Sequence, residues 1–305
     1  MSSKSLIVVT GPTAIGKTDL AIKIALNYGT EIVSADSRQF YKEMSIGTAK
    51  PTKSEIAIVP HHFVDSISIQ DTYSAGKFET EALATINGIF ESHPVAVMVG
   101  GSGLFIKAVT EGFDLFPETD PTVRADLNKV YATEGIKPLQ SQLQTLDPTY
   151  ATQVDLENPQ RIIRALEVSL TTGRPYSSFR DTGICKSRPF RSIKIGLNID
   201  RLQLYERINR RVDIMMEHGL LKEVEQLLPY RNLNALNTVG YSELFDYLDG
   251  KSSLDGAVER IKQNTRRFAK RQLTWFRKDP EIAWFDPQDY SSILEFVESR
   301  LDDNR

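Results

Sequence analysis

Residues 8–20 read VVTGPTAIGKTDL, which is the end of an apolar run, a loop bounded by two glycines and the start of a helix. The spacing of residues 11–18 fits G-x-x-x-x-G-K-[ST], in which successive backbone N–H groups surround phosphate oxygens. In this pattern Lys17 adds positive charge and the hydroxyl of Thr18 reaches Mg²⁺. The apolar run before the loop and the helical spacing after it favour a phosphate-binding loop over a glycine-rich helix start with no ligand.

The first hundred residues alternate short apolar runs with amphipathic segments. The runs SLIVVT, EIVSAD and PVAVMVGG begin at residues 5, 31 and 94, and a helical pattern over 76–90 follows the cap candidate Ser74. This alternation predicts an α/β fold with a parallel sheet flanked by helices, and together with the phosphate-binding loop it resembles the fold of P-loop NTPases. In such a sheet the loops at the carboxyl ends of the strands carry the chemistry.

The sequence changes character after residue 112. Strand patterns disappear, and Pro, Asp and Thr separate helical stretches such as PTVRADLNKVYATEG and NPQRIIRALEVSLTTG. The segment SIKIGLNID, at 192–200, then alternates apolar with other residues and predicts a strand that returns the chain to the sheet. We therefore expect a discontinuous α/β core, residues 1–112 and 190–305, that is interrupted by an all-helical insertion over 113–189.

The composition is typical of a soluble globular protein, since 40% of the 305 residues are hydrophobic and 25% are charged. No apolar run approaches the roughly 20 residues of a membrane-spanning helix, and the apolar part of MSSKSLIVVTG is too short for a signal peptide. The single cysteine, Cys185, excludes an internal disulfide and a cysteine-built zinc site, so we expect a reducing, cytoplasmic location. No long apolar helix is left over outside the expected core, and we expect a monomer.

The segment 260–278 holds eight Lys or Arg and no Asp or Glu, although the whole chain has a net charge of −3. Within it Ile261, Phe268 and Trp275 follow one another at seven-residue intervals and predict a buried stripe beneath a charged face. That face is either solvated or in contact with a phosphate backbone. The insertion has no such excess, since residues 113–190 hold nine Lys or Arg against ten acids, so any RNA contact there must be local.

A phosphate-binding loop alone is compatible with kinases, GTPases and ATP-driven switches. A GTPase requires N-K-x-D, and the only Asn-Lys pair, at Asn128, lacks the Asp. The strand-end acid with which many P-loop ATPases hold Mg²⁺ is also missing, because VAVMVGGSGLF ends in glycines and a serine. Residues 100–103 therefore suggest room for a bulky ligand. The nearest strand-end carboxylate is Asp36, which could bind metal, cap a helix or act as a general base.

Nine blocks of sequence together resemble the bacterial tRNA dimethylallyltransferases, the tRNA isopentenyltransferase family. They lie in the order and approximate spacing of that family between residues 6 and 280: GPTAIGKT, SADSRQFY, GTAKP, HHFVD, YSAGKF, VGGSGLF, NPQRIIRALEV, TVGYSEL and IKQNTRRFAKRQLTWFR. Several of them are far more specific than the phosphate loop. Departures are small: Ile15, Ser102 and Phe105 stand where the family usually has Ser, Thr and Tyr.

The resemblance implies that the loop holds the pyrophosphate of dimethylallyl diphosphate, with Mg²⁺ bound at Thr18 as the cofactor. The catalytic residues that it implies are Asp36, Lys17 and Ser102, and Asp36 would take a proton from the N6 amine of an adenosine. Arg207 and Arg211, spaced i, i+4, match a family pattern that contacts pyrophosphate or acceptor. The diphosphate-binding residues implied are Gly11, Pro12, Thr13, Ala14, Ile15, Gly16, Lys17, Thr18 and Arg211.

The implied partner is the anticodon stem-loop of a tRNA, from which the enzyme must draw an adenosine out of its stack. Arg161 and Arg164 are i, i+3 on one helix and so share a face, which contacts either RNA or solvent and acidic side chains. The tRNA-binding residues implied are Asp36, Ser37, Arg38, Gln39, Ser102, Arg124, Gln160, Arg161, Ile162, Ile163 and Arg164. We expect no membrane partner.

Three other functions are compatible with parts of the sequence. A P-loop kinase of a small metabolite is disfavoured by the missing strand-end acid, and a prenyl transferase that uses free AMP or ADP is disfavoured by the insertion and QRIIR. A non-catalytic RNA-binding protein would not need Asp36, Lys17 and Thr18 together. His61 and His62 are adjacent, so on a strand they point in opposite directions and cannot both bind one metal; a structural role at a strand edge is expected.

Overall fold

The computed structural model describes residues 4–114, 116–180 and 187–302. They form two compact units: unit 1 is Met1–Glu111 with Ser187–Arg305, and unit 2 is Gly112–Lys186. The expected divisions lay after residues 112 and 189. Cys185 lies outside the described residues. Within the described part of the chain, no helix combines the length and the apolar character needed to cross a membrane.

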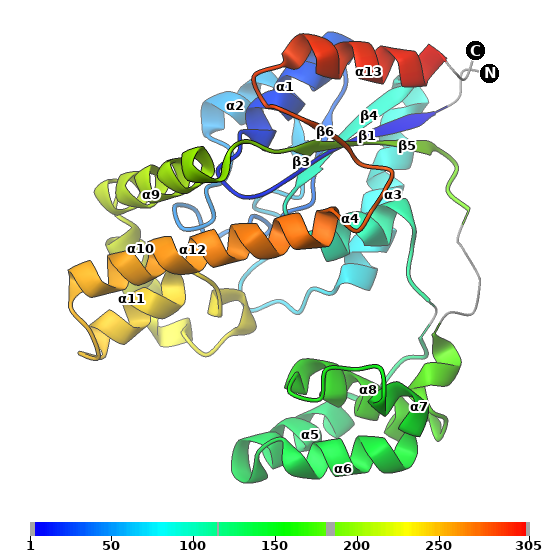
Figure 1. The fold of residues 1–305 in the computed structure, drawn as a ribbon, viewed down its shortest axis with the longest axis vertical. Coiled ribbons are helices and arrows are strands. Elements are labelled where there is room, and N and C mark those ends of the chain that lie inside the picture. The colour runs from blue at the N-terminus through cyan, green and yellow to red at the C-terminus, as the bar shows by residue number, and fades with distance from the viewer. Residues whose placement is uncertain (1–3, 115, 181–186, 303–305) are drawn as a thin grey trace. The chain divides into compact units, whose positions relative to one another are not determined.

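Unit 1 is built on a six-stranded sheet in the order β3-β2-β4-β1-β5-β6, in which every neighbouring pair is parallel (Figure 1). The strands are β1 (Ser5–Thr10), β2 (Ile32–Ser34), β3 (His61–His62), β4 (Val95–Gly100), β5 (Arg191–Leu197) and β6 (Ala283–Phe285). The predicted parallel α/β fold is thus confirmed. The edge strand β6 was not predicted, because three residues are too few to show an alternation.

Helices cover both faces of this sheet, which explains why the middle residues of its central strands are apolar. Every residue of β1 and β4 is buried. One core cluster packs α1, α9 and α13 against the sheet, and a second packs α3 and α4 (Figure 1). The helices of unit 1 are α1 (Lys17–Tyr28), α2 (Lys53–Ile58), α3 (Ala75–Ser92), α4 (Gly103–Thr110), α9 (Arg201–Glu217), α10 (Leu220–Leu227), α11 (Tyr241–Leu248), α12 (Leu254–Phe276) and α13 (Tyr290–Asp302), with 3-10 turns η2 (Leu228–Tyr230) and η3 (Asn234–Leu236).

The prediction of a buried stripe on α12 was wrong for two of its three residues. Ile261 is buried, but Phe268 and Trp275 are 39% and 42% exposed. The first half of α12 packs on α11, whereas the second half packs on the phosphate loop and α4, so the buried stripe turns around the helix. The buried residues of the helix are Ala257, Ile261, Ala269, Gln272 and Phe276.

The regular elements of unit 2, among its described residues, are all helices. The unit contains α5 (Pro121–Glu134), α6 (Lys137–Leu146), α7 (Pro148–Ala151), α8 (Pro159–Thr172) and the 3-10 turn η1 (Tyr176–Phe179) around a core of its own. Two helix starts follow directly from the sequence, because Asp120 and Asn158 each accept a hydrogen bond from a backbone N–H of the first turn and a proline follows each of them.

Candidate active site

The loop after β1 has the backbone of a phosphate-binding loop. Gly11 and Gly16 have φ angles of +144° and +100°, and a Cβ on Gly11 would lie 2.8 Å from the carbonyl oxygen of Leu197, so a side chain is excluded there. Because α1 begins at Lys17, directly after the loop, the loop amides and the positive end of the helix face the same space. The side chain of Ile15 is buried in the core, which leaves only its backbone for a ligand.

Three cations surround this loop. Lys17 Nζ donates to the carbonyl oxygen of Pro12 at 2.8 Å. From α9, Arg207 donates to a second loop carbonyl at 3.3 Å, and Arg211 donates to the hydroxyl of Thr13 at 3.5 Å. The spacing of the two arginines on α9 therefore brings both to the phosphate loop, as a diphosphate site requires.

The ammonium of Lys17 has a lowered pKa in the free protein. Burial lowers its pKa to about 8; the carboxylate of Asp36 acts in the opposite direction, and the guanidinium of Arg211 adds to the lowering. A bound anion would favour the charged ammonium and raise the pKa again. Binding of an anion at this loop is therefore coupled to protonation of Lys17.

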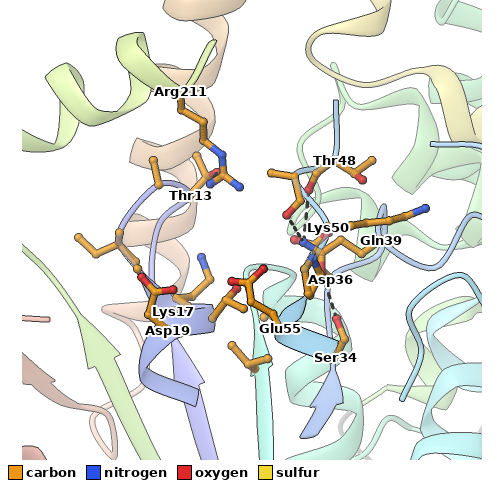
Figure 2. Close-up of a pocket in the computed structure, with 18 of the residues that line it drawn as sticks. Thr13, Lys17, Asp19, Ser34, Asp36, Gln39, Thr48, Lys50, Glu55 and Arg211 are labelled. Carbon is orange, nitrogen blue, oxygen red and sulfur yellow. Dashed lines mark hydrogen bonds between the residues drawn. The ribbon is translucent and has the colours of Figure 1, made fainter. Parts of the chain in front are cut away.

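A cavity of about 380 Å³, here named the phosphate cavity, lies in front of the loop. Figure 2 shows Lys17 and Arg211 on one side of it and Asp36 and Gln39 on the other. Thr18 also lines it. The cavity thus has two cations, Lys17 and Arg211, with Asp19 on one side, and Asp36 with Lys50 and Glu55 on the other.

Asp36 lies just after the carboxyl end of β2. Its Oδ1 accepts a hydrogen bond from the N–H of Arg38 at 3.1 Å, so the carboxylate closes a turn and does not cap a helix. Beside it, Ser102 Oγ accepts from the N–H of Ser37 at 3.0 Å and donates to the hydroxyl of Ser37 at 3.1 Å. The two serines join the loops that follow β2 and β4 and so fix the surroundings of Asp36.

Arg38 and Gln39 are engaged by the backbone of unit 1. The guanidinium of Arg38 donates to three carbonyl oxygens of the segment 234–237, at 3.1, 3.0 and 3.4 Å. The amide of Gln39 donates to the carbonyl oxygens of residues 48 and 49, at 3.3 and 3.1 Å. In this structure both side chains therefore hold the walls of the site, and the guanidinium of Arg38 would have to leave these carbonyls to reach RNA.

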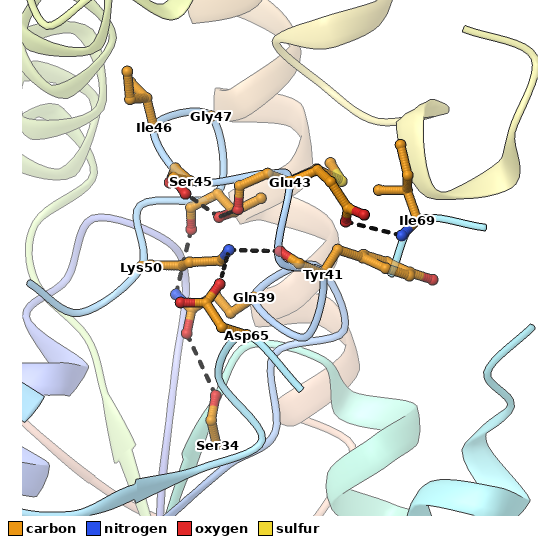
Figure 3. Close-up of polar contacts among 12 residues, drawn as sticks. Ser34, Gln39, Tyr41, Glu43, Ser45, Ile46, Gly47, Lys50, Asp65 and Ile69 are labelled. Carbon is orange, nitrogen blue, oxygen red and sulfur yellow. Dashed lines mark hydrogen bonds and ion pairs between the residues drawn. The ribbon is translucent and has the colours of Figure 1, made fainter. Parts of the chain in front are cut away.

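Polar contacts also fix the long loop after β2 (Figure 3). Lys50, whose side chain is 6% exposed, forms an ion pair with Asp65 and donates to the carbonyl oxygen of Tyr41 at 2.5 Å. Glu43 accepts from the N–H of Ile69 at 3.0 Å. Lys50 thus serves the loop's structure, which distinguishes it from Lys17.

Residues 100–103 were expected to leave room for a bulky ligand; that room lies beside Gly101, Ser102 and Gly103, which line a cavity, and not directly over the two glycines. A Cβ on Gly101 would lie 2.3 Å from Nε2 of Gln272, and one on Gly103 would lie 2.2 Å from the indole of Trp275. Side chains of α12 therefore fill the space that these glycines leave. The glycines allow close packing of α12 on the loop after β4, which the sequence alone did not indicate.

A second cavity of about 720 Å³, here named the apolar cavity, adjoins the phosphate cavity. Asp36, Arg211 and Gln272 line both cavities, so the two meet at these residues. The walls of the apolar cavity include Phe268 and Trp275, whose exposure is thereby explained. Asp36 thus stands between a space suited to phosphate and a space suited to a flat apolar group.

Gln272 is a site residue that sequence analysis did not find. Its side chain is buried; Oε1 accepts from the N–H of Thr13 at 2.9 Å, and Nε2 donates to the carbonyl oxygen of Gly101 at 2.9 Å. It therefore connects the phosphate loop to the loop after β4. Its only signal in the sequence was its place in the block IKQNTRRFAKRQLTWFR, where nothing marks a glutamine among basic residues as part of a site.

Residues 39–279 match the family described as IPP transferase. The chain belongs to this family. It is 55% identical over 300 residues to the tRNA dimethylallyltransferase of Christiangramia forsetii, covering 98% of this chain and 99% of that one. It is 50% identical to tRNA dimethylallyltransferase 1 of Bacteroides thetaiotaomicron, covering 96% and 95% of the two chains.

Solved structures give the same relationship. The full-length tRNA isopentenylpyrophosphate transferase from Bacillus halodurans is similar with a TM-score of 0.74 and 36% identity, over 99% of this chain and 98% of that one. A eukaryotic dimethylallyltransferase described as acting on tRNA is similar with a TM-score of 0.80 and 26% identity, over 98% of this chain and 77% of that one. The resemblance found in the sequence is confirmed.

In unit 2 of this IPP transferase, two of the expected RNA contacts bind a buried acid. Arg124 and Arg164 donate to the carboxylate of Glu167 at 3.0 and 2.9 Å. Burial alone would raise the pKa of Glu167, but the hydrogen bond from Arg164 and the charges of both arginines outweigh it and lower the pKa. Gln160 accepts from Arg124 at 3.5 Å, and Arg161 is exposed. Of the pair on α8, Arg164 is thus paired with an acid and Arg161 is accessible.

The assignment of Ile162 and Ile163 to tRNA binding is corrected by their burial. Both side chains are fully buried in the core of unit 2, so they stabilise the packing of α8 and cannot touch RNA from this position. The block QRIIR combines a polar face with a core face, as an amphipathic helix does. Only its polar residues are available to a ligand.

The two adjacent histidines form the edge strand β3. The ring N–H at Nδ1 of His61 donates to the carbonyl oxygen of Val59 at 2.7 Å, and Nε2 of His62 lies 2.5 Å from the carboxylate of Glu31. Among the residues that the structure describes, no three His, Cys, Asp or Glu side chains form a metal-binding group. These contacts support the structural role that the sequence predicts for the pair.

Proposed function

We propose that this protein transfers the dimethylallyl group of dimethylallyl diphosphate to N6 of the adenosine on the 3′ side of the anticodon in tRNA, releasing pyrophosphate. The observation that carries the proposal is the meeting of two cavities at Asp36, one beside the phosphate loop and its cations and the other larger and apolar. A charged donor and a flat aromatic acceptor can reach this carboxylate from opposite sides. The names of the relatives support the same reaction.

The phosphate loop would hold the leaving pyrophosphate. As the allylic carbon–oxygen bond breaks, negative charge grows on the pyrophosphate oxygens, and donors already in place stabilise that charge more than they stabilise the ground state. Lys17, Arg207 and Arg211 each contact the loop and are therefore close to the developing charge. The ammonium of Lys17 contributes only while it is protonated, which ties binding of the donor to the pKa of about 8 that Lys17 has in the free protein.

The residues of the phosphate cavity fit a role for Mg²⁺. Thr18 lines the cavity, and its hydroxyl with diphosphate oxygens and water makes an all-oxygen ligand set of the kind that Mg²⁺ prefers. Bound at Thr18, Mg²⁺ would supply further neutralisation of the pyrophosphate charge. The acid usual at the end of the neighbouring strand is replaced by glycine and serine, and the diphosphate would provide charged ligands of its own.

Asp36 would act as the general base on the acceptor. The lone pair of the N6 amine is delocalised into the adenine ring, so the amine attacks well only if a proton leaves in step. The carbon–nitrogen bond forms, the carbon–oxygen bond breaks, the N6 proton passes to the Asp36 carboxylate and the electron pair leaves with pyrophosphate. Ser37 and Ser102 line the apolar cavity next to Asp36 and would orient the same amine by hydrogen bonds.

The apolar cavity suits an adenine that has left its stack. Phe268 and Trp275 offer aromatic faces to a base, and such contacts offset the few kcal/mol that unstacking costs. Exposed cations of 260–278, together with Arg161 and a released Arg38, would contact the anticodon stem-loop. We propose that the enzyme works as a monomer in the cytoplasm.

A substrate matrix tests this function. The protein is incubated with labelled dimethylallyl diphosphate or γ-labelled ATP as donor, and with unmodified tRNA or AMP as acceptor. The expected result is label transfer from dimethylallyl diphosphate to tRNA and to no other acceptor. Transfer of the phosphate label from ATP, or prenyl transfer to AMP in preference to tRNA, would overturn the proposal in favour of a kinase or of a nucleotide prenyl transferase.

A further inference from the structure

The contacts of Gln272 lie at one end of the phosphate cavity. Of the phosphate loop, only Thr13 lines both cavities, so it is the loop residue at their junction. Oε1 of Gln272 already accepts the backbone N–H of Thr13 at 2.9 Å. The donors of the loop that are left for phosphate therefore lie on the Lys17 side of Thr13, away from the apolar cavity.

Gln272 is held in this position by a second contact. Its Nε2 donates to the carbonyl oxygen of Gly101 at 2.9 Å, and the approach is possible only because residue 101 has no side chain, as a Cβ would lie 2.3 Å from Nε2. The same Cβ position is 3.7 Å from Nζ of Lys17. Since the lysine of a phosphate-binding loop reaches the outer phosphates of a nucleotide, the amide of Gln272 borders the place where a chain of phosphates would continue.

We propose that Gln272 ends the phosphate cradle at two phosphates and thereby selects a diphosphate that carries an uncharged group over a triphosphate. The inference deepens the proposed function and rests on it in one respect, namely that the donor is a diphosphate. The orientation of Gln272 presents the lone pairs of Oε1 at Thr13, where a third phosphate would need a donor. An uncharged prenyl group requires no hydrogen bond there and passes on into the apolar cavity beside Phe268.

A phosphate-binding loop of this kind usually holds a nucleoside triphosphate. The position of Gln272 explains how such a loop can instead select a diphosphate donor. A phosphate oxygen placed against Oε1 would meet an acceptor with no proton to share, and the loss of one hydrogen bond to a charged group weakens binding roughly 10- to 100-fold. The cation Arg211 lies close by, at 3.5 Å from the Thr13 hydroxyl, but Asp36 on the same junction opposes its attraction for an additional phosphate. Gln272 is thus a specificity-determining residue rather than a reacting one.

The test measures the dissociation constants of inorganic pyrophosphate and inorganic tripolyphosphate by calorimetry, at a fixed excess of Mg²⁺. The proteins compared are the wild type, Gln272→Ala, which frees the Thr13 N–H, and Gln263→Ala, a control at an exposed position of the same helix. The wild type and the control should prefer pyrophosphate. In Gln272→Ala, the dissociation constant of tripolyphosphate divided by that of pyrophosphate should fall about tenfold or more, because the freed N–H of Thr13 strengthens the binding of the longer anion. A ratio that stays within about threefold of wild type overturns the proposal.

Two further measurements keep the outcome unambiguous. If Gln272→Ala lowers the melting temperature so far that binding cannot be measured, Gln272→Asn replaces it, because an amide shorter by one methylene cannot span Thr13 and Gly101 together; the same shift in ratio is expected. Failure of the proposed function would give a different result, namely a wild type that does not transfer the prenyl group from dimethylallyl diphosphate. The two binding constants can still be measured in that case, and they show independently whether Gln272 sets the number of phosphates that bind.

Discussion

Replacement of Asp36 by Asn examines the proposed mechanism at its most specific point. The substitution keeps the shape of the side chain and an Oδ1 that accepts the N–H of Arg38, which lies 3.1 Å away in the wild type, so the turn should survive. What disappears is basicity. If the carboxylate takes the N6 proton, kcat should fall by roughly 10²- to 10⁴-fold, which corresponds to about 2.7–5.4 kcal/mol in the activation free energy.

The assay must separate this loss from an effect on Lys17. In the wild type Asp36 partly counteracts the lowering of the Lys17 pKa, so Asp36→Asn should move that pKa further below about 8 and weaken diphosphate binding at alkaline pH. Single-turnover rates at saturating donor and about pH 6.5, where the ammonium stays protonated, report the base alone. Donor affinity under these conditions should be unchanged.

Asp71→Asn is the matched control for this variant. Asp71 is exposed and, like Asp36, accepts a backbone N–H in a turn, that of Ser68 at 2.8 Å, but it lines neither cavity. Its kcat should equal that of the wild type. The general-base reasoning would be refuted by an Asp36→Asn variant whose kcat lies within about tenfold of wild type, and recovery of activity at high Mg²⁺ would instead indicate a metal ligand.

Three further predictions concern other parts of the molecule. The affinity of the wild type for pyrophosphate should weaken by up to about tenfold per pH unit above pH 8, because Lys17, with its pKa lowered to about 8, loses its charge there. An affinity that does not change between about pH 7 and 9.5 would contradict this. Arg161→Gln should reduce the slope of log affinity for tRNA against log salt concentration by about 1, because one phosphate contact is lost. Arg164→Gln breaks the pair with the buried Glu167 and should chiefly lower the melting temperature. Equal salt slopes in both variants and the wild type would argue against the RNA contact. Gly103→Ala should lower the free energy of unfolding by about 1–3 kcal/mol in denaturant, because the added Cβ would lie 2.2 Å from the indole of Trp275 on α12. A variant as stable as the wild type would show that this packing is loose.

Local patterns predicted the features that depend on local chemistry. The phosphate loop is a contiguous stretch whose glycines need unusual φ angles, and the central strands are apolar because both of their faces are covered. The helical character of unit 2 follows from caps such as Asp120 and Asn158. In each case the residues that specify the feature are close together in the chain.

Features that depend on distant partners could not be predicted in this way. The hydrogen bond between Gln272 and Thr13 joins residues 259 positions apart, and neither residue alone indicates it. The space directly over Gly101 and Gly103 is filled by side chains of a helix that follows much later in the chain, so this close packing was not predicted. The prediction of a buried stripe on α12 was wrong for a related reason, because the elements that bury this helix change along its length.

The most direct measurement of the central claim is the simultaneous quantification of both products in one reaction with unmodified tRNA. The tRNA is digested to nucleosides for mass spectrometry while free pyrophosphate is assayed from the same sample. One pyrophosphate is expected for each N6-dimethylallyladenosine, and the modified nucleoside is expected in the fragment that carries the 3′ side of the anticodon. Pyrophosphate release without the modified adenosine, or a prenyl group on any other atom or nucleoside, would contradict this expectation.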